Sequence, residues 1–205
     1  MHRRHLIQTG FAAAALAPLG ACATAAPRQA TEPAYPIGSD ATAPAYTADE
    51  LVAAGSRQLG IAAEAMGGAI ERVFADQGNN PTAYIAGEEG AGAVGVGLRY
   101  GRGALHMKDG QPPRDVFWQG ISIGWDVGGN ASRVFTLVYG LFTPDAIYRR
   151  YPGVEGSAYL IGGLGVNYQQ ADGIVLAPMR TGVGLRLGAN VGTMAYSRQR
   201  NYVPF

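Results

Sequence analysis

The chain has 205 residues, 47% of them hydrophobic, and a formal net charge of +1 at pH 7. This hydrophobic content excludes wholesale disorder, and the charge lacks the basic excess typical of a nucleic-acid-binding protein. Glycine supplies 31 residues, about twice its usual share, without the triplet repeat of collagen. The composition therefore predicts a globular protein with many turns and roughly one domain in length.

Residues 1–21 have the pattern of an export signal. Arg3 and Arg4 form a basic start, and an apolar run from about Thr9 to Ala21 follows that is too short to span a membrane. The arginine pair is compatible with twin-arginine export and with general secretory export, and both stay open. Removing this segment takes away two of the 16 basic side chains and leaves 14 against 15 acidic ones.

The signal ends in Leu19-Gly20-Ala21-Cys22, which resembles the lipobox of bacterial lipoproteins. Cys22 is the only cysteine in the chain, so it has no internal disulfide partner. We expect its thiol to carry the lipid, and the alternative is a stray thiol at an ordinary cleavage site. Several acyl chains on one chain end hold a protein stably on a membrane. Ala23, in place of an aspartate, favours the outer membrane.

Residues 22–46 contain four prolines among Ala, Thr, Ser and Gly and show no apolar period. This composition is typical of a disordered tether. Together with the lipobox, it predicts an exported, periplasmic domain that stands off the membrane on a lipid anchor.

A helical segment is expected over residues 47–78. Thr47 and Glu50 have the spacing of a capping box, and apolar residues recur at helical spacing as far as Phe74. Gly55, Gly60, Gly67 and Gly68 interrupt the pattern, which predicts two helices or one broken helix. Gly78 and the Asn79-Asn80-Pro81 turn end it. We expect this segment to pack against the sheet or to plug one end of it.

Residues 82–198 alternate short apolar runs with glycine-rich turns, which predicts a mainly β fold: a small antiparallel eight-stranded β-barrel. Thr143-Pro144-Asp145 begins one short helical insertion. The domain is expected to occupy residues 47–205. An outer-membrane barrel is the alternative, which the short strands disfavour. The expected strands are 82–87, 92–100, 103–109, 115–127, 131–141, 156–169, 172–187 and 189–198.

Gly129-Asn130 predicts a two-residue turn between two of these strands. That register places Asp126 opposite Arg133 and Trp125 beside Val134, and opposite charges in such positions stabilise a hairpin. Arg99 is a further charged residue inside an apolar run. We therefore name Arg99, Trp125, Asp126 and Arg133 as candidates for a structural pair or for the lining of a ligand site.

Little in the sequence points to catalysis. His106 is the only histidine left after processing, and with Cys22 lipidated a metal site built on several His and Cys side chains is excluded. No cofactor motif is present, since the glycine runs lack the residues and the helix that a phosphate loop needs. Glu88 and Glu89 are the one pair of adjacent acidic residues in the glycine-rich stretch from Gly87 to Gly140. The pair is compatible with a solvated strand end, or with acid–base chemistry alongside Asp126.

Several motifs resemble the EipA family, a domain-of-unknown-function family of exported envelope-integrity proteins. The resemblance covers about 47–205 and implies an eight-stranded periplasmic barrel that supports the cell envelope, with no established activity and no catalytic residues. The chain departs from the family in ending Tyr202-Val203-Pro204-Phe205 where members have Trp-Asn-Pro-Phe, and in having a lipobox. The motifs are Gly-Leu-Arg-Tyr-Gly (97–101), Trp-Gln-Gly (118–120), Gly124-Trp125-Asp126, Leu137-Val138-Tyr139, 152–159, 182–190 and Pro204-Phe205.

A second, narrower likeness is to SYLF-type lipid-binding domains. Gly-x-Gly-x-Leu at 101–105 and Gly-x-x-x-Gly at 120–124 resemble their strand segments, over about 92–140 only. The sequence thus predicts a non-catalytic, lipid-anchored envelope protein that binds a lipid, a glycan or an envelope protein. The alternative is a hydrolase or transferase acting on an envelope polymer.

Overall fold

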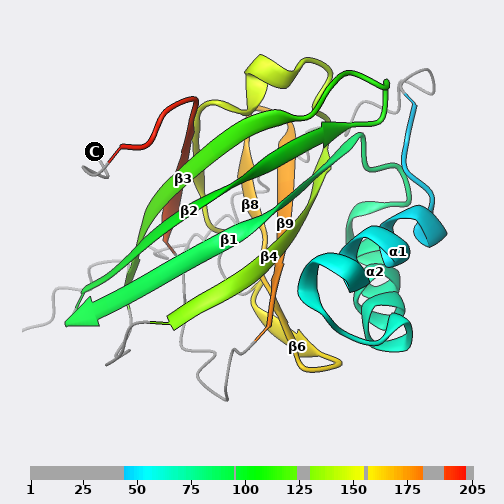
Figure 1. The fold of residues 1–205 in the computed structure, drawn as a ribbon, viewed down its shortest axis with the longest axis horizontal. Helices are drawn as coiled ribbons and strands as arrows, with labels where there is room; N and C mark the ends of the chain where they lie inside the picture. Colours follow the sequence, from blue (N-terminus) through cyan, green and yellow to red (C-terminus); the bar gives the residue numbers. More distant parts are fainter. Residues whose placement is uncertain (1–43, 95, 124–129, 155–156, 182–191, 202–205) are drawn as a thin grey trace, which may run out of the picture. The chain divides into compact units, whose positions relative to one another are not determined.

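The computed structural model describes residues 44–94, 96–123, 130–154, 157–181 and 192–201, all within one compact unit (Figure 1). The expected export signal, Cys22 and nearly all of the expected tether lie outside these residues. The helices are α1 (Ala48–Leu59), α2 (Ala63–Gln77) and the 3-10 helix η1 (Pro144–Ile147). The strands are β1 (Ala83–Val94), β2 (Val96–Met107), β3 (Arg114–Ile123), β4 (Asn130–Tyr139), β5 (Arg150–Pro152), β6 (Tyr159–Ile161), β7 (Leu164–Val166), β8 (Gln169–Ala171), β9 (Ile174–Arg180) and β10 (Thr193–Ser197).

Helix α1 begins and helix α2 ends where the sequence predicts, but of the four glycines expected to interrupt the helical pattern only Gly60 does so, since Gly55 lies within α1 and Gly67 and Gly68 lie within α2. Thr47 and Glu50 form the capping box at the start of α1. Gly60 adopts a left-handed conformation with φ of 68°, which ends α1, and its N–H donates to the Ser56 carbonyl at 2.8 Å. The break at Gly60 therefore gives two helices rather than one bent helix. The expected insertion is the single turn η1.

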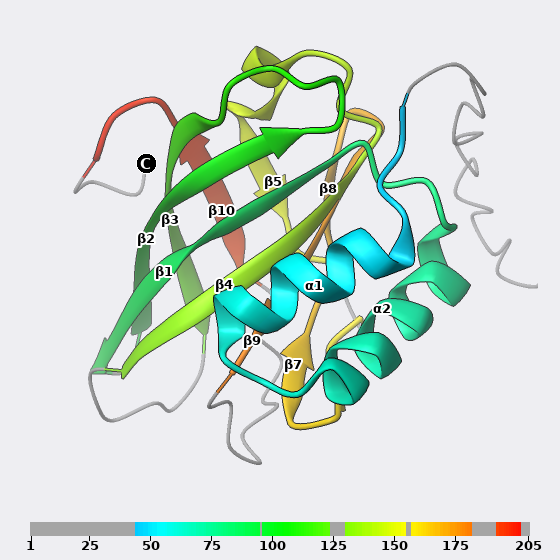
Figure 2. The same ribbon diagram turned by 45° about the vertical axis from the view of Figure 1, so that its right-hand side comes forward.

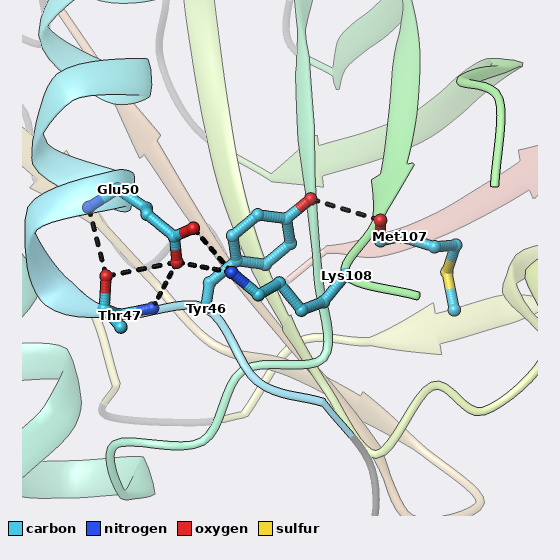
Figure 3. Close-up of polar contacts among 5 residues, drawn as sticks. All are labelled: Tyr46, Thr47, Glu50, Met107 and Lys108. Atoms are coloured by element: carbon cyan, nitrogen blue, oxygen red, sulfur yellow. Dashed lines mark hydrogen bonds and ion pairs between the residues drawn. The ribbon is translucent and has the colours of Figure 1, made fainter. Parts of the chain in front are cut away.

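A set of polar contacts joins the start of α1 to the end of β2; we call Tyr46, Glu50 and Lys108 the N-terminal latch (Figure 3). Lys108 Nζ donates to the two Glu50 carboxylate oxygens at 2.5 and 2.6 Å, and its ammonium lies 4.8 Å from the centre of the Tyr46 ring. The Tyr46 hydroxyl donates to the Met107 carbonyl at 3.2 Å. Tyr46 thus packs with the fold, one residue before the expected domain start.

All described strands belong to one antiparallel sheet with the order β5-β10-β3-β2-β1-β4-β9-β7-β6. β1 and β2 form a long hairpin, β3 lies beside β2, and β4 returns to lie beside β1, which is a Greek-key order. The predicted hairpin between the strands around 115–127 and 131–141 is therefore wrong. β4 buries Val134 and Val138 on one face and Phe135 and Leu137 on the other, so it needs cover on both faces. β4 lies between β1 and β9, where one of its faces packs into the inside of the sheet and the other packs against the helices.

The expected break before residue 92 and the expected turn at 101–102 are also wrong, because β1 and β2 run straight through these glycines. Around the rest of the sheet, β7 and β8 pair with different halves of β9, as one interrupted strand would. An isolated bridge between Gly153 and Gln169 links the end of β5 to β8. The described strands therefore make a mainly β, barrel-like antiparallel sheet, as predicted, but with ten strands rather than the eight expected.

Alternate residues of the sheet build two separate cores. The inner face carries residues such as Ile85, Trp118 and Leu176 in one buried cluster. The outer face of β4 and β9 carries residues such as Phe135 and Met179, which form a second cluster with residues of α1 and α2. Figure 2 shows both helices on one side of the sheet. The helices therefore cover the outside of the sheet: of the two expected arrangements, packing against the sheet is confirmed and plugging one end of it is wrong.

Candidate functional site

The inner face of the sheet holds a charged group, the inner cluster, made of Glu89, Arg99, Arg180 and Trp118. Arg180 Nε donates to Glu89 Oε1 at 2.9 Å, and Arg180 Nη2 donates to Oε2 at 3.3 Å. The Trp118 indole N–H donates to Oε2 at 2.9 Å, and Arg99 Nη1 lies 3.6 Å from Oε1. Both carboxylate oxygens are thus engaged from β2, β3 and β9, strands far apart in the sequence.

Burial and charge act in opposite directions on the Glu89 carboxyl, whose side chain is 2% exposed. Burial alone would raise its pKa, but Arg180 and Arg99, with the hydrogen bonds from Arg180 and Trp118, outweigh this effect and hold the pKa below its usual value. An ionised carboxylate with both oxygens occupied accepts hydrogen bonds and gives no proton. The inner cluster is therefore suited to fixing the sheet rather than to acid–base catalysis.

Glycines on the inner face make room for this arrangement. A Cβ on Gly101 would overlap the Trp118 indole, and one on Gly87 would lie 2.6 Å from the far end of the same ring. A Cβ on Gly120 would overlap the Met194 sulfur. The glycine-rich strands thus fill the inside of the sheet with a few large side chains, as the sequence predicts for a small barrel.

The opposite face of β1–β3 carries a depression that we call the outer groove. Two adjoining hollows of about 380 and 490 Å³ share Glu88, Arg102 and Phe117. These three residues are neighbours in one cross-strand row, with Glu88 opposite Arg102 and Arg102 opposite Phe117. In the next row Gly90 lies opposite Tyr100, so β1 contributes no side chain to the floor at that position. The outer groove is thus an open, mixed polar and aromatic surface.

Two segments border the outer groove. Gln58 of α1 lines one hollow and donates its side-chain amide to the Gly87 carbonyl at 2.8 Å. Arg200 and Asn201, which follow β10, line the other hollow. The groove therefore runs over the sheet surface between the end of α1 and the C-terminal segment.

The structure separates the residues that the sequence singled out. Arg99 belongs to the inner cluster, whereas Arg133 is exposed on the outer face beside Gly60 at the end of α1. Arg133 lies opposite Glu88 of β1. Trp125 and Asp126 fall outside the described residues, so their proposed roles stay predictions, as does the lipidation of Cys22.

Glu88 and Glu89 are neighbours in β1 and consequently point to opposite faces of the sheet. Glu88 is 66% exposed and lies 3.8 Å from Arg102, whereas Glu89 is buried. The reading of this pair as a solvated strand end is wrong in its position, because both residues lie within β1, and Glu88 alone is exposed to solvent. Sequence reasoning also missed Arg180, although alternation from Ile174 and Leu176 places it on the inner face, where a lone charge needs a partner.

Three further observations concern possible chemistry. His106 is half-buried and stacks on Tyr84 with ring centres 4.6 Å apart, and burial lowers its pKa. Within the described residues, no group of three or more His, Cys, Asp or Glu side chains is placed to hold a metal ion. Across the same part of the chain, no helix has both the length and the apolar character needed to cross a membrane.

Comparisons with known proteins agree with this architecture. Residues 44–205 match the model of a family described as envelope integrity protein A (EipA). A crystal structure of a β-barrel-like, uncharacterised protein from Brucella abortus is similar at 46% identity and a TM-score of 0.70, over 80% of this chain and 100% of that one. None of the curated proteins compared matches the chain.

Proposed function

Because the chain belongs to the EipA family, we propose that it supports cell-envelope integrity as a lipid-anchored, non-catalytic periplasmic protein. It acts by holding an envelope component in the outer groove. Cys22 carries the lipid, most of residues 22–46 is the tether, and the outer membrane is the site of anchoring. The family description supports the envelope role, and the lipobox, the composition of 22–46 and Ala23 support the anchor.

One observation carries the binding role. The buried carboxylate of the sheet is closed off between arginines on the inner face, while the polar and aromatic side chains of the outer groove are open to solvent. Removing one partner of a buried charged pair is strongly destabilising, whereas the exposed Glu88 and Arg102 of the groove can meet a ligand at little cost to the fold.

The N-terminal latch supports the anchored arrangement. It fixes the segment that arrives from the tether to the end of β2 through Lys108 and Tyr46 (Figure 3). Tension on the tether would then pass directly into the sheet rather than peel α1 away from it. The latch thus suits a domain held between a membrane and a second envelope component.

An enzyme acting on an envelope polymer is the second candidate, and Glu88 is the residue that favours it. Its carboxylate is 66% exposed at the outer groove, whereas the Glu89 carboxylate is 2% exposed and already engaged by Arg180 and Trp118. Glycoside hydrolysis needs two carboxyl groups flanking the scissile bond. Asp115 lines the same hollow as Glu88 and would have to supply the second one.

Complementation of a deletion strain separates the two candidates. Detergent sensitivity should be rescued fully by Glu88→Gln and by Asp115→Asn, each present at normal level. Failure of either folded variant, with accumulation of an uncleaved polymer, would favour the enzyme. Cys22→Ser should release the folded protein from outer-membrane fractions, and retention there after a salt wash would contradict the lipid anchor.

A further inference from the structure

The strongest unexplained feature of the molecule is the outer groove, because it lies over the middle of a sheet rather than at an edge. β1, β2 and β3 are each paired with strands on both sides. A peptide that adds as a strand needs a free edge. The groove must therefore recognise its occupant through side chains.

The groove lining combines flat apolar surfaces with paired donors and acceptors. Phe117 and Tyr100 are partly exposed aromatic residues in neighbouring rows of the floor. Arg102 and Arg200 are exposed donors, and the Glu88 carboxylate is an exposed acceptor. Sugar rings offer the matching surface, with a flat C–H face for an aromatic ring and hydroxyls that both donate and accept.

Two other occupants fit this lining less well. An acyl chain needs an enclosed apolar cavity, whereas both hollows are open to solvent and share Glu88 and Arg102, with 66% and 65% of their side chains exposed. A polyanion such as nucleic acid needs a basic surface, whereas Glu88 and Asp115 balance Arg102 and Arg200. The balanced charge favours a chain that carries mainly neutral polar groups with occasional charges.

We propose that the outer groove binds a glycan strand of the cell wall, a claim that rests on the proposed envelope function. Two adjoining hollows suit successive sugars of a linear chain. Phe117 and Tyr100 stack on sugar rings, the amide of Asn201 pairs with acetamido groups, and Arg102 and Arg200 bind the lactyl or peptide carboxylates of the wall. The expected tether, about 25 residues long, gives this surface a reach of about 25–30 Å from the membrane anchor.

Gly90 offers a clean way to fill the groove. It lines the floor, and a Cβ added there would meet the Tyr100 carbonyl oxygen at 3.9 Å, an ordinary contact. Gly90→Phe should therefore block the groove without displacing the backbone. Gly67→Phe is the matched control, because a Cβ on Gly67 of α2 has no described atom within 4 Å and the residue lies away from the groove.

The test is cosedimentation of the full-length mature protein, in detergent, with purified protein-free peptidoglycan sacculi. The wild type and Gly67→Phe should sediment with sacculi, and Gly90→Phe should bind about tenfold more weakly or not at all. Arg102→Ala should weaken binding while Arg72→Ala, another exposed arginine paired with one carboxylate, should not. Circular dichroism checks that each variant keeps the wild-type melting temperature.

Two results would overturn the inference: no sedimentation of the wild type, or equal sedimentation of Gly90→Phe. The same variants in the deletion strain keep the two claims apart. Suppose that the wild type fails to sediment with sacculi while Gly90→Phe still fails to restore detergent resistance. In that case the groove is needed for envelope integrity, and only the proposal that it binds a glycan is wrong.

Discussion

On the two faces of β1 and β2, glutamate and arginine side chains differ in burial and in how tightly they are paired. On the inner face, Glu89 is held by two arginines and an indole in a nearly closed space. On the outer face, Glu88 and Arg102 form a loose pair at 3.8 Å, open to solvent. Exposed pairs contribute little to stability, while a buried pair is costly to break. The comparison assigns folding to the inner face and recognition to the outer one.

The largest expected contrast comes from the two neighbouring glutamates. Glu89→Ala should destabilise the protein by about 3–5 kcal/mol, because it leaves the buried Arg180 without a carboxylate partner. Glu88→Ala should change the free energy of unfolding by about 0.5 kcal/mol or less. Urea unfolding followed by tryptophan fluorescence measures both. Equal effects of the two substitutions would contradict the assignment of the inner cluster to stability.

Glycines on the two faces should behave differently as well. Gly101→Ala forces a methyl group into the Trp118 indole and should cost about 1–3 kcal/mol. Gly90→Ala makes only an ordinary contact, 3.9 Å from the Tyr100 carbonyl oxygen, and should be neutral or slightly stabilising. The melting temperatures of the two variants check this difference. A harmless Gly101→Ala would show that the indole does not lie over β2.

Lowering the pH should destabilise both the inner cluster and the N-terminal latch, through Glu89 in the first and Glu50 in the second. The pKa of Glu89 is lowered, so its contribution to stability is complete above the ordinary carboxyl value of 4.5 and is lost as the pH falls through the folded pKa. In the latch, hydrogen bonds from Lys108 and Thr47 lower the pKa of Glu50 to about 2, with the same sign.

Stability should therefore fall as the pH drops below about 4.5, and Glu89→Gln should flatten this part of the profile because it cannot titrate. Urea midpoints measured from pH 7 to pH 2 give the profile. An unchanged acid slope in Glu89→Gln would mean that Glu89 is not ionised in the folded protein.

Local signals in the sequence predicted the local parts of the fold. The capping box at Thr47, the break at Gly60 and the turn of helix after Thr143 depend on neighbours along the chain. The pairing of β4 with β1 does not, because it joins residues about 45 positions apart in the chain and depends on burying both faces of β4. The Gly129-Asn130 turn motif carries no information on whether both faces of β4 must be buried.

The candidate site was predictable only in part, for the same reason. Arg99 stood out as a charge in an apolar run, but its partner Glu89 seemed a solvated residue beside Glu88. Arg180 closes the inner cluster from β9, 91 positions beyond Glu89. Only the assembled sheet shows which of two adjacent glutamates faces inward, since a shift of one residue in register exchanges the faces.

The most direct test of the account compares one folded variant from each face in the deletion strain. Glu89→Gln/Arg180→Met removes the buried ion pair yet leaves Trp118 an acceptor, and Gly90→Phe fills the outer groove. Measured as detergent resistance at equal protein level, the inner double variant should restore the wild-type value, while Gly90→Phe should leave the strain sensitive. Full resistance with Gly90→Phe, or sensitivity with a stably folded inner double variant, would contradict the placement of function on the outer face.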